Sequence, residues 1–485
     1  MAKIIGSITG TTYKDFVIHP GYTTSEHIPS NIDINTKIGD IVIKPFLPAA
    51  MRSIVDERFA LEAAKIGLMA VAPRGLSIQK QVDIVRYVKE NEVKKGEIES
   101  IENPVTLLDD NTIADAIENV SKYGHSNMPV KDRLGRYKGM FKYEPLYHDR
   151  MEPNTPIQKI MKPFDYKKDL WVSDNMSEKE IKEFMKKYDL RLVPVLEEIE
   201  TKKGKEYRLR KLVFRQENEG YRIGGAIDTH PGWEERAKAL VEAGADIIFI
   251  DTSDAYTEWA SDVVKRFKEK YERQICAGNI VTPEGFRYLA KAGADAIKIG
   301  MGPGSICITS AVLGVGAPPF SSLVRIAKER DRYADKRYIP IIADGGMEDT
   351  HDICIALTHA DAIMSGKLFA CFEESAGKLV EKNGKKFKEY WGEGSKRAAE
   401  TTGDMKRYEI PGERQTLIYQ GVDGLVLYQG YLKPGVEKYS MALKITMSHV
   451  GAKNLEEYRK KAVLERLSEA SKRMLGPHDI VIIDE

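Results

Sequence analysis

A glycine-rich stretch in the second half of the chain carries the residues best suited to covalent chemistry. It reads Gly-Met-Gly-Pro-Gly-Ser-Ile-Cys-Ile-Thr over residues 300–309, after a short apolar run. Glycines let backbone N–H groups come close to an anionic or planar ligand. A thiol at the mouth of such a loop ionises more easily than one in an apolar core, so we predict that Cys307 is a nucleophile with Thr309 beside it. The alternative is a buried structural cysteine next to an ordinary turn.

Short apolar runs, each followed by a polar residue or a glycine, recur on both sides of this loop. The runs over 247–250, 296–299, 339–343 and 362–364 are followed by Asp251, Gly300, Asp344 and Ser365. Helical patterns lie between the runs, and this alternation predicts parallel strands joined by crossover helices. Polar residues gathered at the C-terminal ends of such strands are typical of a (β/α)8 barrel, so we predict an α/β protein with that fold.

A charged segment over residues 96–215 interrupts the alternation and contains two similar halves. Each half has a helical pattern, over 113–123 and 181–188, followed by a strand pattern with a central Pro-Val. The shared order predicts a duplicated α/β module, against the alternative of two coincidental Pro-Val dipeptides. We therefore expect residues 1–95 and 216–485 to form the barrel together, with the module inserted between barrel units.

The C-terminal part of the chain is harder to assign. The region about 380–435 is glycine-rich, charged and poorly periodic. A segment of this length without clear elements favours a lid or binding loop, the alternative being disorder. We expect a helical stretch over about 455–474, followed by an apolar tail over 480–483.

Composition and charge argue against several classes of function. Lys+Arg number 74 against 73 Asp+Glu, a net charge of +1, so no charge excess would attract nucleic acid or an anionic membrane. The first residues lack the apolar core of a secretory signal and no run could span a bilayer, so we expect a cytoplasmic protein. The four cysteines show neither CxxC pairing nor a zinc spacing, which fits reduced thiols without a structural metal.

Further motifs accompany the cysteine loop in a fixed order. They are Ala343–Gly346, Tyr390 with Gly392–Ser395, Arg407-Tyr408, and Gln420–Gly424. Together with the inserted module they resemble the IMP dehydrogenase family, a (β/α)8 barrel interrupted by two CBS repeats. The likeness covers nearly the whole chain. It implies that 96–215 is a tandem CBS (Bateman) module and that the region about 380–435 is a mobile flap.

The resemblance implies a covalent hydride-transfer mechanism. Cys307 would attack C2 of the purine of IMP, hydride would pass to NAD, and water would hydrolyse the thioimidate to release XMP. A thiolate is both a good nucleophile and a good leaving group, which suits the two steps. Thr309, Arg407 and Tyr408 would activate the water. Arginine is a poor base at its free pKa, so that role comes from the family and not from the residue type.

The resemblance also implies binding residues and partners. The phosphate of IMP would contact Ser305, Gly346, Gly366 and Tyr390, with Gly345 and Lys367 beside them, and Asp344 would accept a ribose hydroxyl. The purine edge would lie against Gly392, Glu393, Gly394 and Gln420. The dinucleotide side would comprise Asp251, Thr252, Ser253, Gly300, Met301 and Gly302. The carbonyls of Gly302, Gly304 and Cys307 would bind potassium, and the family implies a homotetramer.

Some residues depart from the family's pattern. Lys367 stands where the family commonly has serine, and Glu393 where it commonly has methionine. After Gly139-Met140 the usual Thr/Ser-x-x-Asp is missing, so we expect a structural or assembly role for the CBS pair and not nucleotide regulation. Three of these residues have a purely structural alternative: Asp344 could cap a strand end, Tyr390 could be a packing aromatic, and Arg407 could be a surface charge.

Two rival functions stay open. GMP reductase shares the barrel, the cysteine loop and the threonine, but deaminates GMP reductively with NADPH. The Arg407-Tyr408 pair and the insertion carrying Gln420 favour the hydrolytic dehydrogenase. A non-catalytic purine nucleotide sensor is the second rival, and the intact Cys307 and Thr309 argue against it.

Overall fold

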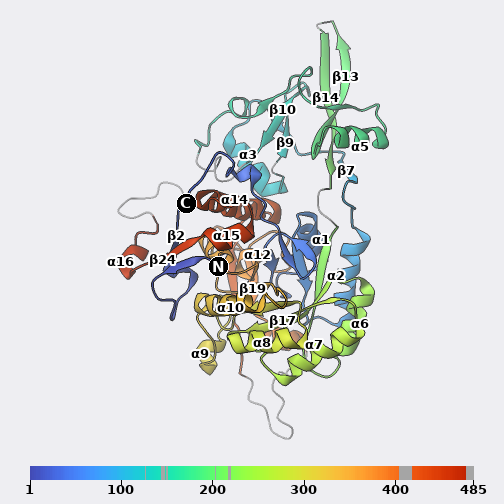
Figure 1. Cartoon of the computed structure of the whole chain (residues 1–485). Helices are drawn as coiled ribbons and strands as arrows, with labels where there is room; N and C mark the ends of the chain where they lie inside the picture. Colours follow the sequence, from blue (N-terminus) through green and yellow to red (C-terminus); the bar gives the residue numbers. More distant parts are fainter. Residues whose placement is uncertain are drawn as a thin grey trace. The chain divides into compact units, whose positions relative to one another are not determined.

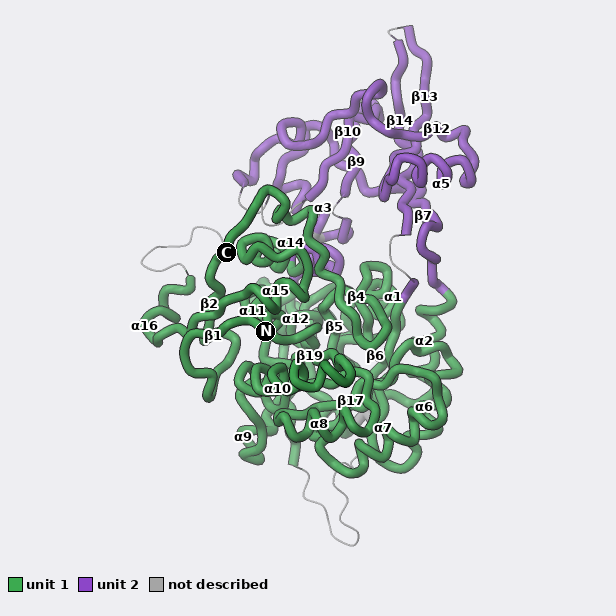
Figure 2. Tube along the Cα trace, viewed as in Figure 1, with its two compact units in different colours: residues 1–90, 222–428, 439–485 green, residues 91–221, 429–438 purple. Residues whose placement is uncertain are grey.

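The computed structural model describes residues 1–125, 127–143, 148, 151–202, 204–216, 220–402 and 418–476. The chain divides into two compact units (Figure 2). Unit 1 contains residues 1–90, 222–428 and 439–485, and unit 2 contains 91–221 and 429–438. Among the helices of the described ranges, none is both long and apolar enough to cross a membrane.

Unit 1 is built around an eight-stranded parallel sheet with the topology of a (β/α)8 barrel. Its strands, in sheet order, are β5 (Phe46–Pro48), β20 (Ala362–Ser365), β19 (Ile341–Asp344), β18 (Ala296–Ile299), β17 (Gln274–Ile280), β16 (Ile247–Ile250), β15 (Arg222–Ile227) and β6 (Met69–Ala72). β5 and β6 follow one another in the chain and stand at the two ends of this order, so the sheet is nearly closed. The strands are buried on both faces, which explains why they read as continuous apolar runs. The predicted barrel is confirmed.

Helices connect the strands and lie around the outside of the sheet (Figure 1). They are α1 (Glu57–Lys65), α2 (Ile78–Glu90), α6 (Trp233–Ala243), α7 (Glu258–Lys270), α8 (Pro283–Ala292), α9 (Thr309–Leu313), α10 (Pro319–Tyr333), α11 (Thr350–Leu357) and α12 (Lys367–Ala370). Local sequence fixes several ends: Thr257 and Thr282 cap the starts of α7 and α8 with their side chains. Gly244 and Gly293 end α6 and α8 with φ angles of +101° and +109°, which favour glycine.

The chain termini of unit 1 differ from the sequence prediction. The expected helix over 455–474 is in fact α15 (Leu455–Lys461), strand β24 (Val463–Arg466) and α16 (Glu469–Lys472). β24 pairs with both β1 (Lys3–Ile5) and β2 (Phe16–His19), and this long-range pairing overrides the helical pattern. A hairpin of β3 (Thr36–Ile38) and β4 (Ile41–Ile43) also lies outside the barrel. The apolar tail over 480–483 lies outside the described residues.

The region about 380–435 contains regular elements that its sequence did not reveal. β21 (Leu379–Lys382), β22 (Lys385–Trp391) and β23 (Asp423–Leu427) form an antiparallel sheet, and α13 (Lys396–Thr402) follows β22. The strands are largely exposed and β22 is rich in lysine, so they lack the apolar alternation that marks a half-buried strand. Helix α14 (Leu432–Val450) begins inside the expected loop, which shortens it further.

Unit 2 contains two halves with the same strand pairing. In the first, β8 (Leu107–Leu108) is parallel to β9 (Asn127–Lys131), which is antiparallel to β10 (Tyr137–Lys142). In the second, β12 (Val172–Ser173) is parallel to β13 (Leu192–Thr201), which is antiparallel to β14 (Gly204–Arg215). The helices α3 (Ile113–Tyr123) and α5 (Glu178–Lys187) connect the parallel strands, and each begins at a capping box. β11 (Lys162–Pro163) and β7 (Ile98–Ile101) complete the two sheets.

Candidate active site

The cysteine loop begins where β18 ends. Gly300 has φ +142°, and a Cβ there would overlap the carbonyl oxygen of Asp344 at the end of the neighbouring strand. Gly302 has φ +89°, and a Cβ there would overlap the hydroxyl of Ser310. These glycines therefore let the loop fold tightly against the barrel's own backbone, and they place it at the C-terminal ends of the strands, where such barrels carry their chemistry.

Cys307 is half-buried, in contrast to the other three cysteines. Cys276, Cys354 and Cys371 are free but buried, and burial raises the pKa of Cys354 to about 11 and that of Cys371 to about 12. The Cys307 thiol donates to the Thr309 hydroxyl at 3.2 Å. The predicted pair is therefore in contact, and Cys307 is the cysteine that solvent and a ligand can reach.

Gln420 lies against this pair although it is distant in sequence. The Thr309 hydroxyl donates to the Gln420 side-chain oxygen at 3.2 Å. Two backbone hydrogen bonds hold the segments together: the N–H of Ile308 donates to the Gln420 carbonyl at 2.9 Å, and the N–H of Val422 to the Ile306 carbonyl at 3.0 Å. The structure thus brings together Cys307, Thr309 and Gln420.

The segment expected at the purine edge lies on the other side of Gln420. The N–H of Gln420 donates to the Gly394 carbonyl at 3.1 Å, and the N–H of Gly392 to the Val422 carbonyl at 3.1 Å. The carboxylate of Glu393 is bound by Arg52, through the backbone N–H at 2.7 Å and Nε at 3.0 Å. Sequence reasoning missed Arg52, because only the folded sheet brings the end of β5 to this segment.

Asp344, at the end of β19, is surrounded by donors. Its Oδ2 accepts from Asn279 Nδ2 at 2.9 Å and lies 3.2 Å from Lys298 Nζ. Gly345 and Gly346 follow with φ +83° and +77°, and both face Pro303 of the cysteine loop. The aspartate is therefore a fixed, charged acceptor beside that loop, and Asn279 and Lys298 are functional candidates that the sequence did not reveal.

Lys298 links Asp344 to Asp251. The Lys298 side chain is 2% exposed, and its Nζ also donates to Asp251 Oδ1 at 3.1 Å. Burial alone would lower the pKa of Lys298, but the charges of Asp344 and Asp251 outweigh it and raise that pKa above its ordinary value. The Lys298 ammonium thus connects Asp344, which is predicted to bind ribose, with Asp251, which is predicted to lie on the dinucleotide side. The only sequence signal was a lone lysine inside an apolar run.

Two buried polar atoms near these aspartates have no hydrogen-bond partner among the described residues: Asn279 Oδ1 and Arg74 Nε. Arg74 follows β6, and its guanidinium lies 3.7 Å from Asp228 and 3.8 Å from Asp251, beyond hydrogen-bonding distance. Buried polar groups are ordinarily satisfied. The ends of β6 and β17 therefore hold hydrogen-bonding capacity that the described residues do not use.

Tyr390 is buried with its hydroxyl over Gly366. A Cβ on Gly366 would overlap the Tyr390 hydroxyl, which also lies 4.0 Å from the sulfur of Met51. Burial, and then the charge of Asp344, raise the pKa of Tyr390 above its ordinary value, so the phenol is a neutral donor. Lys367 is half-buried at the start of α12, and Ser305 is exposed on the cysteine loop.

The remaining predicted residues fall on the same side of the barrel or outside the described chain. Thr252 Oγ1 donates to the Gly278 carbonyl at 3.1 Å, and Ser253 is half-buried. A cleft of about 350 Å³ adjoins the loop and is lined by Met301, Gly302, Pro303, Ser310, Gly314, Gly316, Ala317, Pro318 and Pro319. Arg407 and Tyr408 lie outside the described residues.

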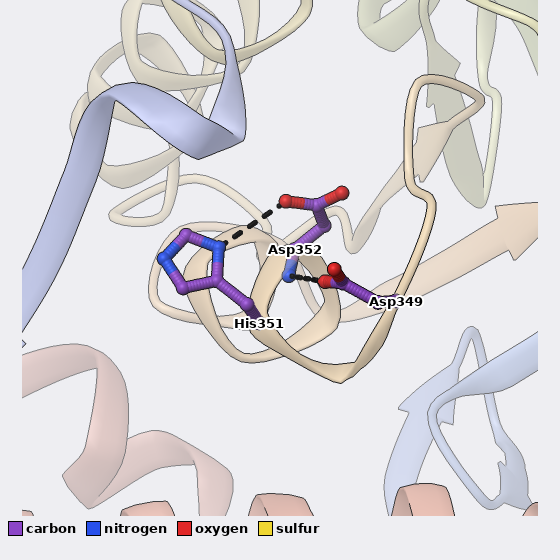
Figure 3. A group of neighbouring side chains, drawn as sticks. All are labelled: Asp349, His351 and Asp352. Carbon is purple, nitrogen blue, oxygen red and sulfur yellow. Dashed lines mark hydrogen bonds and ion pairs between the residues drawn. The ribbon is translucent and has the colours of Figure 1, made fainter. Parts of the chain in front are cut away.

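Potential cation ligands occur at two places. In the cysteine loop the Gly304 carbonyl accepts the Cys307 N–H at 3.0 Å and keeps a second lone pair. Asp349, His351 and Asp352 are the one described group of acidic and histidine side chains close enough to share a metal (Figure 3). Asp349 caps α11 by accepting the Asp352 N–H, and the Lys14 ammonium pairs with both carboxylates. This group is therefore a helix cap that already has its cation.

Comparison with known proteins supports one family. A family model described as "IMP dehydrogenase / GMP reductase domain" matches residues 10–478. Inosine-5'-monophosphate dehydrogenase of Tritrichomonas foetus is 33% identical over 504 residues, covering 98% of this chain and 96% of the relative. The enzyme of the same name from Aquifex aeolicus is 32% identical over 488 residues, with the same coverages. Among solved structures, a GMP reductase of Trypanosoma brucei, crystallised as a variant in complex with guanosine 5'-monophosphate, has a TM-score of 0.67 and 27% identity, covering 98% of each chain.

Proposed function

This chain belongs to the IMP dehydrogenase / GMP reductase family of oxidoreductases, and we propose that it oxidises IMP to XMP with NAD. The observation that carries the proposal is the contact of Cys307 with Thr309 and of Thr309 with Gln420. It gives one site a nucleophile, a hydroxyl and an amide that can face the same purine carbon. Relatives named for this activity match nearly the whole chain.

In the first step the thiolate of Cys307 adds to C2 of the purine and the hydrogen on C2 leaves as hydride. NAD, when bound, supplies the acceptor for that hydride. The product on the protein is a thioimidate at Cys307. Water then adds to C2, the carbon–sulfur bond breaks, and XMP leaves while the thiolate is regenerated. We propose that Thr309, with Arg407 and Tyr408, orients this water and takes its proton.

The substrate would be held by groups with fixed positions. Asp344, bonded to Lys298 and Asn279, would accept the ribose hydroxyls. The neutral hydroxyl of Tyr390 and the backbone near Gly346, Gly366 and Ser305 would donate to the phosphate, with Lys367 adding charge. The backbone of Gly392–Gly394 and the amide of Gln420 would face the purine edge.

We infer that the dinucleotide binds at the other side of the barrel mouth. Asp251, Thr252, Ser253 and the loop residues Gly300, Met301 and Gly302 would line it. The fit is supported by the unused Asn279 Oδ1 and Arg74 Nε, which could bond the amide and hydroxyl groups of a dinucleotide. A potassium ion would be held by the carbonyls of Gly302, Gly304 and Cys307, which are oxygen ligands of the type a hard cation prefers.

We also infer that unit 2 is a tandem CBS module with an assembly role, in a cytoplasmic homotetramer. The shared strand–helix–strand–strand order of its halves supports the module. Mass determination of the full chain in solution, compared with a variant lacking residues 96–215, tests the assembly role. Identical oligomeric states would refute it.

GMP reductase is the second candidate, since a solved structure of that name is similar over 98% of this chain. Incubation with IMP and NAD, and separately with GMP and NADPH, while following absorbance of the reduced cofactor, distinguishes the two. We expect activity in the first mixture, and activity only in the second would overturn the proposal.

The Cys307→Ala variant should abolish turnover and keep IMP binding, because the thiol forms the intermediate. Undiminished turnover would refute the covalent mechanism.

A further inference from the structure

An ion pair that the reaction scheme does not use lies beside the candidate active site. Arg52 follows β5, and it binds Glu393 with its backbone N–H at 2.7 Å and its Nε at 3.0 Å. A third bond runs from Arg52 Nη2 to the carbonyl of Ala398 in α13 at 3.1 Å. The guanidinium is thus held at two points, Nε and Nη2, and with the backbone N–H it fixes the segment between Trp391 and α13.

The pair is largely shielded from water. The side chains of Arg52 and Glu393 are 10% and 16% exposed. Gly75 packs over them so closely that a Cβ would lie 2.7 Å from Glu393 Oε2 and 2.8 Å from Arg52 Nε. Removing one partner of such a pair leaves the other charge poorly solvated, whereas replacing both by apolar side chains removes the imbalance.

Hydrogen bonds connect this pair to the nucleophile. Gly392 and Gly394, on either side of Glu393, bond to Val422 and Gln420. The side chain of Gln420 bonds to Thr309, and Thr309 bonds to Cys307. A displaced Glu393 segment would therefore move the backbone expected at the purine edge and the amide beside Thr309 together.

We propose that Arg52 is a positioning residue for nucleotide binding, which acts through Glu393 and does not touch the nucleotide. It holds residues 392–395 in the conformation that presents their backbone to the purine and keeps Gln420 against Thr309. The inference rests on the proposed function in that it takes this segment to be the purine site.

The test is a double-substitution cycle read out as the Kd of IMP, measured by calorimetry on the full chain without NAD. Arg52→Met and Glu393→Met should each weaken binding by about tenfold, which corresponds to about 1.4 kcal/mol. The Arg52→Met/Glu393→Met double variant should also be about tenfold weaker, no worse than either single variant, because both substitutions remove the same contact. Arg58→Met is the matched control, and it should leave the Kd unchanged. The Arg58 side chain is 57% exposed, and its guanidinium lies 3.9 Å from the Glu373 carboxylate, beyond hydrogen-bonding distance.

Two results would overturn the inference: single variants with an unchanged Kd, even if their melting temperature falls, or a double variant whose loss is the product of the two single losses, about a hundredfold. The second result would mean that Arg52 and Glu393 act on the nucleotide independently. If Arg52→Met does not fold, Arg52→Lys, which keeps the charge but loses the fork geometry, should weaken IMP binding by about threefold, and no change would refute the role. Binding without turnover would refute the proposed function and leave this inference standing.

Discussion

The barrel has aspartates at both ends of its strands, and the two ends use them differently. At the N-terminal ends, Asp246, Asp295 and Asp361 each precede a strand and accept an N–H from the neighbouring strand at 2.9 Å. At the C-terminal ends, Asp228, Asp251 and Asp344 pair with the side chains of Arg74 and Lys298. Both sets meet cationic side chains, but the first set also joins neighbouring strands of the sheet, whereas the second set lies at the barrel mouth.

Asp361 shows how complete the bonding of one of these N-terminal aspartates is. Its carboxylate is 2% exposed and binds Arg330 at 3.0 Å, Tyr338 at 2.6 Å and Arg459 at 3.2 Å, as well as the N–H of Ile341. Burial alone would raise the pKa of Asp361, but Arg459 and Arg330 outweigh it and hold the pKa below its ordinary value. This is a closed network, and what it stabilises is the barrel.

The C-terminal network is open by comparison. Asn279 Oδ1 and Arg74 Nε are buried without partners among the described residues, and the distances from Arg74 to its two carboxylates exceed hydrogen-bonding range. Unsatisfied groups of this kind cost stability in the free protein and gain a partner when a ligand binds. Arg222 Nε, at the start of β15, is also buried without a partner among the described residues, so the N-terminal end as a whole is not fully bonded. The contrast is between two networks: the closed network of Asp361 stabilises the barrel, and the open network at the barrel mouth keeps bonding capacity for a ligand.

The largest expected effect is the loss of the closed network. Asp361→Asn leaves Arg330 and Arg459 buried without a counter-charge, so the free energy of unfolding in urea should fall by about 3–5 kcal/mol. The KM for IMP should not change. The matched control is Asp331→Asn, because Asp331 also bonds Arg330 but is 34% exposed, and it should cost less than about 1 kcal/mol. Equal losses in the two variants would contradict the distinction between the ends.

A smaller, pH-dependent effect comes from His359, whose carbonyl accepts from Arg330 in the same network. Burial, with the charges of Arg330, the N-terminus and Lys328, lowers the pKa of His359 from 6.5 to about 3. Between those pH values only the unfolded chain binds the proton, so this histidine makes stability fall as the pH falls from 6.5 towards 3. At pH 4.5 the loss should be about 2.5 kcal/mol relative to pH 7.

The measurement is the free energy of unfolding of the parent and of His359→Gln at several pH values. Glutamine keeps a polar side chain beside Thr358, which bonds His359 Nδ1 at 2.8 Å, but it does not titrate. The variant should therefore lose less stability on acidification than the parent does. Parallel pH profiles would show that His359 titrates normally and that this end of the barrel is not closed.

The same comparison explains what could be predicted from the sequence. The barrel and the cysteine loop were predictable, because apolar runs, helix caps and glycine spacing are local signals. The strand-leading aspartates were visible as the repeated Ala-Gly-Ala-Asp over 243–246 and 292–295, although their bonding to the neighbouring strand was not. Lys298 stands inside an apolar run, so the sequence alone assigns its position to the core. Its role depends on the ion pairs with Asp251 and Asp344, which only the folded sheet brings close to it.

Other errors have equally physical causes. Helix α14 was missed because Pro434 and Gly435 lie near its start, where proline is tolerated but reads as a break. β24 was taken for helix because Val463–Arg466 has no strong strand pattern of its own and becomes a strand by pairing with β1 and β2. Arg52 follows β5 and bonds Glu393, 341 residues further along the chain, and Arg74 follows β6 and lies near Asp228 and Asp251. No local sequence pattern predicts contacts over such separations.

The smallest expected effect concerns the open network and should leave stability nearly intact. Asn279 Nδ2 donates to the Gly300 carbonyl at 2.7 Å and to Asp344 at 2.9 Å, so Asn279→Ala frees the start of the cysteine loop and one acceptor predicted to bind ribose. We expect kcat/KM for IMP to fall by about tenfold, which is about 1.4 kcal/mol of transition-state stabilisation. The free energy of unfolding should fall by less than about 1 kcal/mol, because the substitution also removes the unsatisfied Oδ1. A variant that lost as much stability as Asp361→Asn while keeping its kcat/KM would place Asn279 in the structural network and reverse the assignment of the two ends.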